Sequence, residues 1–290
     1  MADGAARVLA YTFRLAWPIE IDERLEVYDD GGVWYWSLRP AEEAKRDRAG
    51  TFTFHVDDAE LRELEALADE VDAEPAVDAT QPRGSLELVV SGRSGSQLLS
   101  RSEPLSPTLE RAREVGLGLR ARAESAPLAV VRVSWRPLEP ELHTSRATSV
   151  FFECENVGVV PVDVVFEPQS FMLLAVVDGG AEAWWQAGPN GTMGLTDDLG
   201  RLLGGITSPA RLEPGEGGSA LFLDALRPRR PGRVPAAAVA EGRLSLRRPG
   251  GSAATGPETL LLGEDVLGDA GVPDGPFRVE TPLRELEIVD

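Results

Sequence analysis

The feature that most constrains the fold is a series of short apolar or alternating runs after Pro127, each broken by Pro, Gly or Asn. A period of two places successive side chains on opposite faces of a strand, and short strands at this spacing are typical of a β-sandwich. We therefore expect an antiparallel, immunoglobulin-like β-sandwich domain over residues 126–290. The runs are 129–135, 149–154, 162–166, 171–177, 181–186, 220–223, 242–246 and 277–279.

The first 125 residues mix two periodicities and predict an α+β domain. Residues 29–32, Asp-Asp-Gly-Gly, separate two apolar runs and indicate a hairpin. Leucines recur at helical spacing after Asp57, which is a suitable helix cap. A later helix is weakened by Gly116 and Gly118. The expected order is strands (8–15, 25–28, 33–38, 51–56), a helix (61–71), strands (86–90, 97–99) and a helix (104–124), so the whole chain is mainly β.

Two parts of the second domain do not fit a simple sandwich. Residues 189–209 form a glycine-rich stretch with scattered apolar side chains, which is a long insertion and either a functional loop or a packed Ω-loop. Residues 228–235 and 249–276 are rich in Pro and Gly, and we expect them to be mobile.

The charge of the chain restricts its partners. A formal net charge of -19 disfavours nucleic acid, because affinity for the phosphate backbone comes mainly from cationic side chains. The same charge disfavours anionic lipid surfaces, and no apolar window is long enough for a transmembrane helix. The N-terminal residues do not resemble a secretory signal, and the single cysteine agrees with a reducing compartment. We therefore expect a cytoplasmic protein.

Residues with catalytic chemistry are few. The imidazoles are His55, on the polar face of a strand, and His143, in a loop; Cys154 shares the apolar face of its strand. Lys45 is the only lysine, and it lies in a charged run. The sequence contains no zinc spacing, phosphate-binding loop or dinucleotide-binding loop. We predict no catalytic residue, no metal and no cofactor.

Aromatic residues are the candidate binding residues. Trp34, Tyr35 and Trp36 follow one another on an expected strand, so Trp34 and Trp36 share one face and Tyr35 takes the other. Trp184 and Trp185 must likewise lie on opposite faces. These side chains either fill a core on one face and an interdomain contact on the other, or they form a partner-binding patch, since Trp and Tyr are common anchors of interfaces.

Two stretches resemble bacterial proteinase inhibitors. Thr51-Phe52-Thr53-Phe54, the Leu61-Arg62-Glu63-Leu64-Glu65 helix and Pro104-Leu105-Ser106-Pro107 look like the emfourin type of metalloprotease inhibitor. Phe152-Glu153-Cys154-Glu155-Asn156-Val157-Gly158 and Leu212-Glu213-Pro214-Gly215-Glu216 are similar to the intracellular proteinase inhibitor family, which has an immunoglobulin-like fold. The resemblance implies inhibitory activity and assigns no functional residue.

Three functions follow from these patterns. The first is a non-catalytic protein-binding or assembly module, acting through the aromatic residues, residues 189–209 and complementarity to a basic surface. The second is an intracellular proteinase inhibitor. The third is a hydrolase that uses a pair of carboxylates, for which adjacent acids such as Asp197 and Asp198 are easy to find and weak indicators.

Overall fold

The computed structural model of the chain describes residues 5–15, 21–40, 46–75, 86–94, 96–100, 105–166, 171–177, 180–186, 195–197, 201–204, 209–246 and 275–290. Contacts between Cα atoms divide the chain into two compact units. The described residues of the first unit lie within Met1–Ala41 and Gly50–Leu128, and those of the second lie within Glu42–Ala49, Ala129–Gly251 and Asp274–Asp290. Residues 46–49 therefore belong to the second unit although the first unit continues after them.

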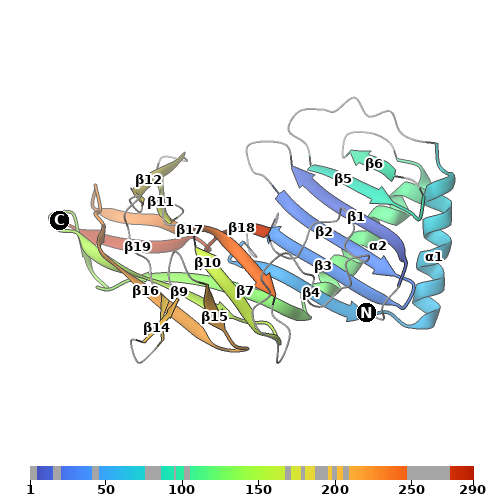
Figure 1. Cartoon of the computed structure of the whole chain (residues 1–290). Coiled ribbons are helices and arrows are strands. Elements are labelled where there is room, and N and C mark those ends of the chain that lie inside the picture. The colour runs from blue at the N-terminus through green and yellow to red at the C-terminus, as the bar shows by residue number, and fades with distance from the viewer. Residues whose placement is uncertain are drawn as a thin grey trace. The chain divides into compact units, whose positions relative to one another are not determined.

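The first unit is an antiparallel sheet that carries two helices (Figure 1). Its strand order is β4-β3-β2-β1-β5-β6, and α1 and α2 contact each other and the sheet. The α+β prediction is confirmed here. The elements are β1 (Arg7–Leu15), β2 (Ile21–Tyr28), β3 (Gly32–Arg39), β4 (Arg48–His55), α1 (Asp58–Ala73), β5 (Leu86–Ser91), β6 (Ser96–Ser100) and α2 (Pro107–Ala123).

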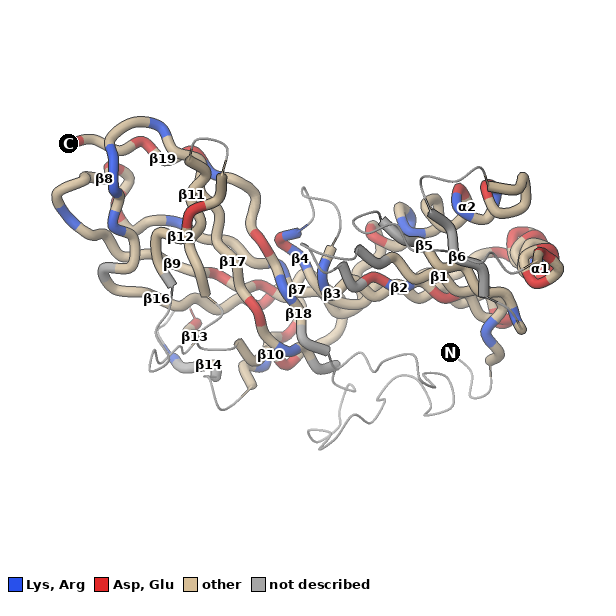
Figure 2. Tube along the Cα trace, turned by 90° about the horizontal axis from the view of Figure 1, so that it is seen from above, with Lys and Arg blue, Asp and Glu red and all other residues tan. Residues whose placement is uncertain are grey.

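Local chemistry explains where these elements begin and turn. Gly31 has a φ of 82°, a conformation that glycine adopts without strain, and its N–H donates to Tyr28 O at 3.0 Å to close the β2–β3 hairpin. Asp57 caps α1, since its Oδ1 accepts from the N–H groups of Ala59 and Glu60, both at 2.9 Å. Ser106 caps α2 in the same way, since its Oγ accepts from the N–H group of Leu109 at 3.3 Å. Figure 2 shows acidic residues over much of α1, whose apolar stripe is buried.

The second unit is an antiparallel sandwich of two sheets, as predicted. The first sheet has the order β14-β13-β16-β9-β7 within this unit, and the second has the order β12-β11-β17-β10-β15 with β18, β19 and β8 attached. The one parallel contact among the described strands joins β8 and β19. The elements are β7 (Pro127–Pro137), β8 (Leu142–His143), β9 (Thr148–Asn156), β10 (Val162–Phe166), β11 (Met172–Val177), β12 (Gly180–Gln186), β13 (Leu195–Thr196), β14 (Leu202–Gly204), β15 (Ala210–Leu212), β16 (Gly217–Leu226), β17 (Gly232–Leu246), β18 (Gly275–Glu280) and β19 (Arg284–Val289).

Phenylalanines from both sheets form the core of the sandwich. The ring of Phe152 on β9 lies 5.8 Å from that of Phe166 on β10 and 4.3 Å from that of Phe171, in edge-to-face arrangements. Phe166 also meets Phe277 of β18, and Phe222 of β16 meets Phe171. Side chains of one parity on β9 and β16 therefore point into the core, and those of the other parity point away from it.

Of the expectations about loops, one is wrong, and the others fall mostly outside the described residues. Residues 232–235 are not a mobile loop but the start of β17. Pro235 is tolerated because it lies opposite Glu285 of β19, just before the part of β17 that pairs with β11 at Ala236. Within 189–209, residues 195–196 and 202–204 form β13 and β14, and most of the remainder lies outside the described residues, as do 249–274.

Candidate functional site

The three consecutive aromatic residues of β3 lie on the faces predicted for them, and all three are buried. Trp34 and Trp36 stack with their ring centroids 6.2 Å apart, beside Tyr28. Tyr35 packs on the opposite face, with its ring centroid 5.5 Å from that of Phe52. Ala5 and Leu128 are described neighbours of the stacked pair. A partner-binding role for these side chains stays a prediction.

The tryptophans of β12 also lie mostly within the protein. Trp184 is buried, and Trp185 is half-buried with its ring centroid 4.9 Å from that of Phe222 on the other sheet. The register between β11 and β12 shifts between Leu173 and Leu174, opposite this tryptophan pair. Trp185 therefore packs between the two sheets of the sandwich. A role for either tryptophan in binding stays a prediction.

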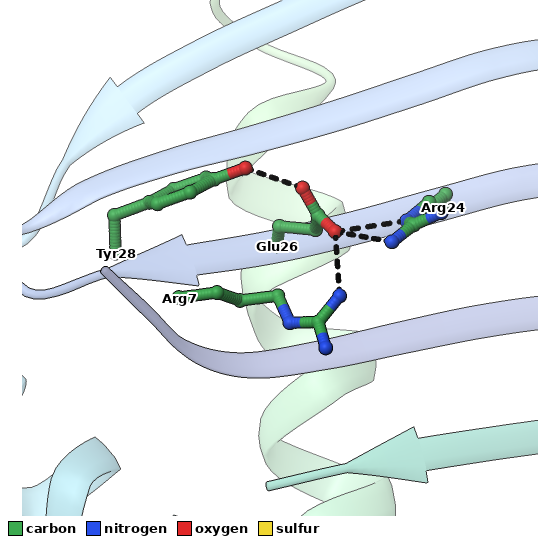
Figure 3. Close-up of polar contacts among 4 residues, drawn as sticks. All are labelled: Arg7, Arg24, Glu26 and Tyr28. Carbon is green, nitrogen blue, oxygen red and sulfur yellow. Dashed lines mark hydrogen bonds and ion pairs between the residues drawn. The ribbon is translucent and has the colours of Figure 1, made fainter. Parts of the chain in front are cut away.

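A carboxylate with two arginines lies on the same face of the first unit's sheet as Trp34 and Trp36 (Figure 3). Glu26 is buried, and its Oε1 accepts from Arg24 Nε at 2.9 Å and Nη2 at 2.5 Å, and from Arg7 Nη1 at 3.4 Å. The Tyr28 hydroxyl donates to Glu26 Oε2 at 2.5 Å. Burial and the adjacent carboxylate raise the pKa of Tyr28. Four polar side chains thus satisfy one another, which is the arrangement of a structural cluster.

A second buried carboxylate points to the opposite face of β2. Glu23 Oε1 accepts from Arg120 Nη2 of α2 at 3.1 Å and from the Tyr35 hydroxyl at 2.9 Å. Arg120 Nε also donates to the Tyr35 hydroxyl at 3.1 Å. Burial and the nearby Glu23 charge raise the pKa of Tyr35. This network fixes α2 to the sheet by a charge pair that is shielded from water.

The remaining candidate reactive groups lie on three different strands, β4, β8 and β9. His55 is exposed on β4, as its strand parity predicted. His143 Nδ1 lies 3.4 Å from the backbone oxygen of Asp290. Cys154 is buried, and burial raises the pKa of its thiol well above the usual range, which keeps it protonated and unreactive. Among the described residues, no three His, Cys, Asp or Glu side chains are placed to hold a metal ion.

An open surface of the second unit is the side of β7, β9 and β16 that points away from the sandwich core. Successive rows across these strands are Arg132–Glu155–Gly217, Ser134–Glu153–Ser219 and Arg136–Phe151–Leu221. The backbone bond from Leu138 N to Ser149 O, 2.8 Å long, extends the ladder by a further row. We call these residues, together with Leu223, the outer face.

One half of the outer face is polar and hollowed. Arg132 Nη2 lies 2.6 Å from Glu155 Oε2, and Arg136 Nε lies 3.1 Å from Glu153 Oε1. The Ser134 hydroxyl donates to Glu153 Oε2 at 3.0 Å. Because β16 begins at Gly217, which has no side chain, the space beside the Arg132–Glu155 pair stays open, and only the small Ser219 of that strand lies beside Glu153. The result is an open groove of about 520 Å³ lined by all three strands.

The other half of the outer face is apolar. Leu221 and Leu223 of β16 are 46% and 74% exposed, and Leu138 beyond β7 is 49% exposed. Between them Phe151 lies beneath the guanidinium of Arg136, whose central carbon is 4.3 Å from the ring centroid. The pairing of β16 with β9 is irregular between Phe222 and Leu226, which accompanies the high exposure of Leu223. Clustered exposed side chains of this kind mark interaction surfaces.

The sequence contains a signal for the outer face that lies outside the tryptophan runs. Phe151-Phe152 and Leu221-Phe222-Leu223 are consecutive apolar residues on strands. A strand with one buried face needs an apolar side chain only at every second position, so each run must place at least one on the other face. The rule that selected Trp34–Trp36 also applies to these two runs.

Comparisons with known proteins do not assign the chain to a family. No protein-family model matches it, and no curated protein matches it. Among solved structures, the chain is similar to the ASH / PapD-like domain of human CEP192 (PapD-like domain 7), with 13% sequence identity and a TM-score of 0.22. That match covers 55% of this chain and 85% of the other. A TM-score this low carries no conclusion about fold or function.

Neither helix in the described part of the chain is long and apolar enough to cross a membrane.

Proposed function

We propose that this chain is a non-catalytic, cytoplasmic protein-binding module that uses the outer face of its second unit. The observation that supports the proposal is the side-by-side arrangement of an exposed apolar cluster and a charge-lined groove on three hydrogen-bonded strands. Protein interfaces combine an apolar centre with a polar rim, and a face built on a sheet is already rigid before a partner binds. Leu221 and Leu223 would form the centre, and the arginine–glutamate pairs would form the rim.

The test compares capture by matched leucine variants. The double variant Leu221→Asp with Leu223→Asp places two charges at the proposed centre without changing the core side of β16. Leu283→Asp is the control, because Leu283 is also in the second unit and is 49% exposed. We expect immobilised wild type and L283D to retain the same partner from a lysate of the source cell at ~0.15 M salt, and the double variant to lose it by more than tenfold.

The captured protein must then bind directly. Titration of the purified partner into wild type should give a dissociation constant that the double variant weakens and the control leaves unchanged. Equal capture by wild type and the double variant would remove the outer face from the proposal, and a role for Trp34, Tyr35, Trp36, Trp184 and Trp185 would become the next prediction to test.

Proteinase inhibition remains a more specific form of the same proposal, supported by the resemblance of residues 51–123 and 152–216 to inhibitor families. Dose-dependent inhibition of a metalloprotease or serine protease by wild type, and loss of inhibition in the double variant, would support it. The carboxylate hydrolase has less support. The buried Glu23 and Glu26 and the groove residues Glu153 and Glu155 all accept contacts from arginine, which suits fixed charges better than proton transfer.

A further inference from the structure

The charges of the outer face are sorted by strand. The β7 side contributes Arg132 and Arg136, and the β9 side contributes Glu153 and Glu155. The hydrogen-bonded register places the two columns beside each other at the ordinary strand spacing of about 4.8 Å. The exposed side chains therefore form a positive column next to a negative column, with Phe151 and the leucines at the end of both.

A surface of this kind is complementary to itself. Consider a two-fold axis that lies in the plane of the interface, runs parallel to the strands and passes between β7 and β9. Rotation about this axis places the β7 column of one copy opposite the β9 column of the other, at the same height along the strands. Arg132 then faces a second Glu155, and Arg136 faces a second Phe151, whose ring already accepts a guanidinium within one chain.

We propose that the outer face binds a second copy of this chain, so that the module forms a symmetric face-to-face dimer. This inference rests on the proposed function and names the partner for the same surface. The same rotation places the exposed Leu138 of each copy over Ser149 of the other, while Leu221 and Leu223 of β16 lie outside the two paired columns. Leu138, which a single chain leaves 49% exposed, becomes covered in the dimer.

The net charge of the chain favours this surface over others for self-association. Two copies that each carry a formal charge of -19 repel each other wherever acidic surfaces meet. The outer face has two arginines and two glutamates and is locally neutral, so contact there adds little repulsion. The long-range repulsion is screened within about 8 Å at 0.15 M salt, while the apolar contacts are unaffected.

The dimer should be weak and reversible. Four rows on the two facing strands cover roughly 10 by 24 Å on each copy, from the usual strand spacing and rise per residue. The area buried by such a contact falls in the lowest size class of specific interfaces, well below the roughly 1,600 Å² of a standard complex. We expect dissociation in the range of about 10 to 100 µM, where small interfaces of transient complexes lie.

The test uses a pair of charge-reversed variants. Arg132→Glu with Arg136→Glu makes both columns acidic, and Glu153→Arg with Glu155→Arg makes both columns basic. In the proposed dimer each variant faces a column of its own sign and should remain monomeric. An equimolar mixture restores opposite signs across the two-fold axis and should associate. The ion pairs lost within each chain are exposed and contribute little to folding.

Sedimentation velocity from roughly 5 to 500 µM protein at ~0.15 M salt is the measurement. Wild type and the control Arg278→Glu, which breaks a comparable exposed pair with Glu241, should shift from monomer toward dimer as the concentration rises. Each outer-face variant alone should sediment as a monomer, and their mixture should regain the dimer, which also shows that both variants are folded.

The outcomes separate this inference from the proposed function. A wild type that stays monomeric throughout, variants that dimerise alone, or a mixture that does not associate would each overturn the dimer. If the dimer is absent and capture of another protein still depends on Leu221 and Leu223, the proposed function stands with a different partner. If wild type does not dimerise and capture of another protein does not depend on Leu221 and Leu223, both proposals are overturned.

Discussion

Glu23 and Glu26 on β2 bury one carboxylate on each face of the same sheet. Arginine balances the charge of each carboxylate, and a tyrosine hydroxyl donates a hydrogen bond to it. A carboxylate removed from water without such partners would take up a proton or destabilise the fold. The two clusters differ in where the cations come from. Arg24 and Arg7 belong to neighbouring positions in the sheet, whereas Arg120 reaches Glu23 from α2.

Replacement of Arg120 should therefore cost far more stability than replacement of its neighbour Arg122. Arg120→Met leaves Glu23 buried without its cation, and we expect the free energy of unfolding to fall by about 3–5 kcal/mol. Arg122→Met removes an exposed pair with Glu60 and should cost at most about 1 kcal/mol. Urea titration followed by circular dichroism measures both values, and equal losses would show that burial of the Glu23 pair does not control stability.

Asp57 gives the chain an acid-sensitive helix cap. Hydrogen bonds from the backbone N–H groups of Glu60 and Ala59 lower the pKa of Asp57 below its ordinary value of 3.8. A lowered folded-state pKa adds stability that is present above the unfolded pKa and disappears as the pH falls through the folded pKa. Asp57→Asn keeps a cap that does not titrate, so wild type should lose more stability than this variant between pH 6 and pH 2.

Urea midpoints at several values of pH measure this difference. Asp57→Ala is the companion variant, because it lacks the cap at every pH and should be less stable than Asp57→Asn throughout. Parallel pH profiles for wild type and Asp57→Asn would contradict the assignment of the acid-sensitive contribution to this cap.

Residue patterns predicted which side chains share a face more reliably than which side chains are buried. The period of two placed Trp34 and Trp36 opposite Tyr35, and the structure agrees. Burial of both faces depends on residues that are distant in the sequence, such as Arg120 or Leu128, and a local pattern contains no information about them. For the same reason, the local pattern can place Phe151, Leu221 and Leu223 on one face of their strands but cannot show that Leu221 and Leu223 stay exposed.

At the scale of elements, α2 contains two glycines that the sequence cannot distinguish. A Cβ on Gly116 would lie 2.5 Å from the Tyr11 ring, whereas a Cβ on Gly118 would have no neighbour within 4 Å. Gly116 therefore permits the close approach of α2 to β1, and Gly118 only weakens the helix. Helix propensity alone assigned both residues the same destabilising effect.

Alanine substitutions at the two positions should consequently have opposite signs. Gly118→Ala should stabilise the chain by about 0.5–1 kcal/mol through helix propensity. Gly116→Ala should destabilise it by about 1–3 kcal/mol, since the buried Tyr11 must move to make room. Thermal and urea unfolding of both variants provide the measurement, and stabilisation by both would mean that the contact between Tyr11 and α2 relaxes at no cost.

Strands that pair over long sequence distances were the elements hardest to predict. Both helices were predicted because their apolar spacing and caps are local. β17 extends fifteen residues and pairs with four strands, so its register is set by partners as distant as β10 and β19. That tertiary pairing outweighs the turn signal of Pro228 to Pro235, which would end a strand if only local preference mattered.

For the whole molecule, the two units are not divided at a single point of the sequence. Residues 46–49 belong to the second unit, where Asp47 O accepts from Val133 N and Arg46 O accepts from Glu280 N, both at 2.8 Å. Burial raises the pKa of Asp47, which agrees with a segment held inside that unit. A domain boundary after residue 125, predicted from composition, would separate this segment from the sheets that it contacts.

A chain divided at that boundary tests whether the segment matters. We expect residues 126–290, produced alone, to melt at a lower temperature than the same fragment mixed with residues 1–125, because the mixture restores residues 46–49 to Val133 and Glu280. Arg46→Ala in the shorter fragment, which removes an ion pair with Glu280, should reduce the rescue only slightly, since the backbone bonds remain. Identical melting of residues 126–290 with and without the other half would establish 125/126 as a true boundary and make residues 46–49 a linker rather than a part of the sandwich.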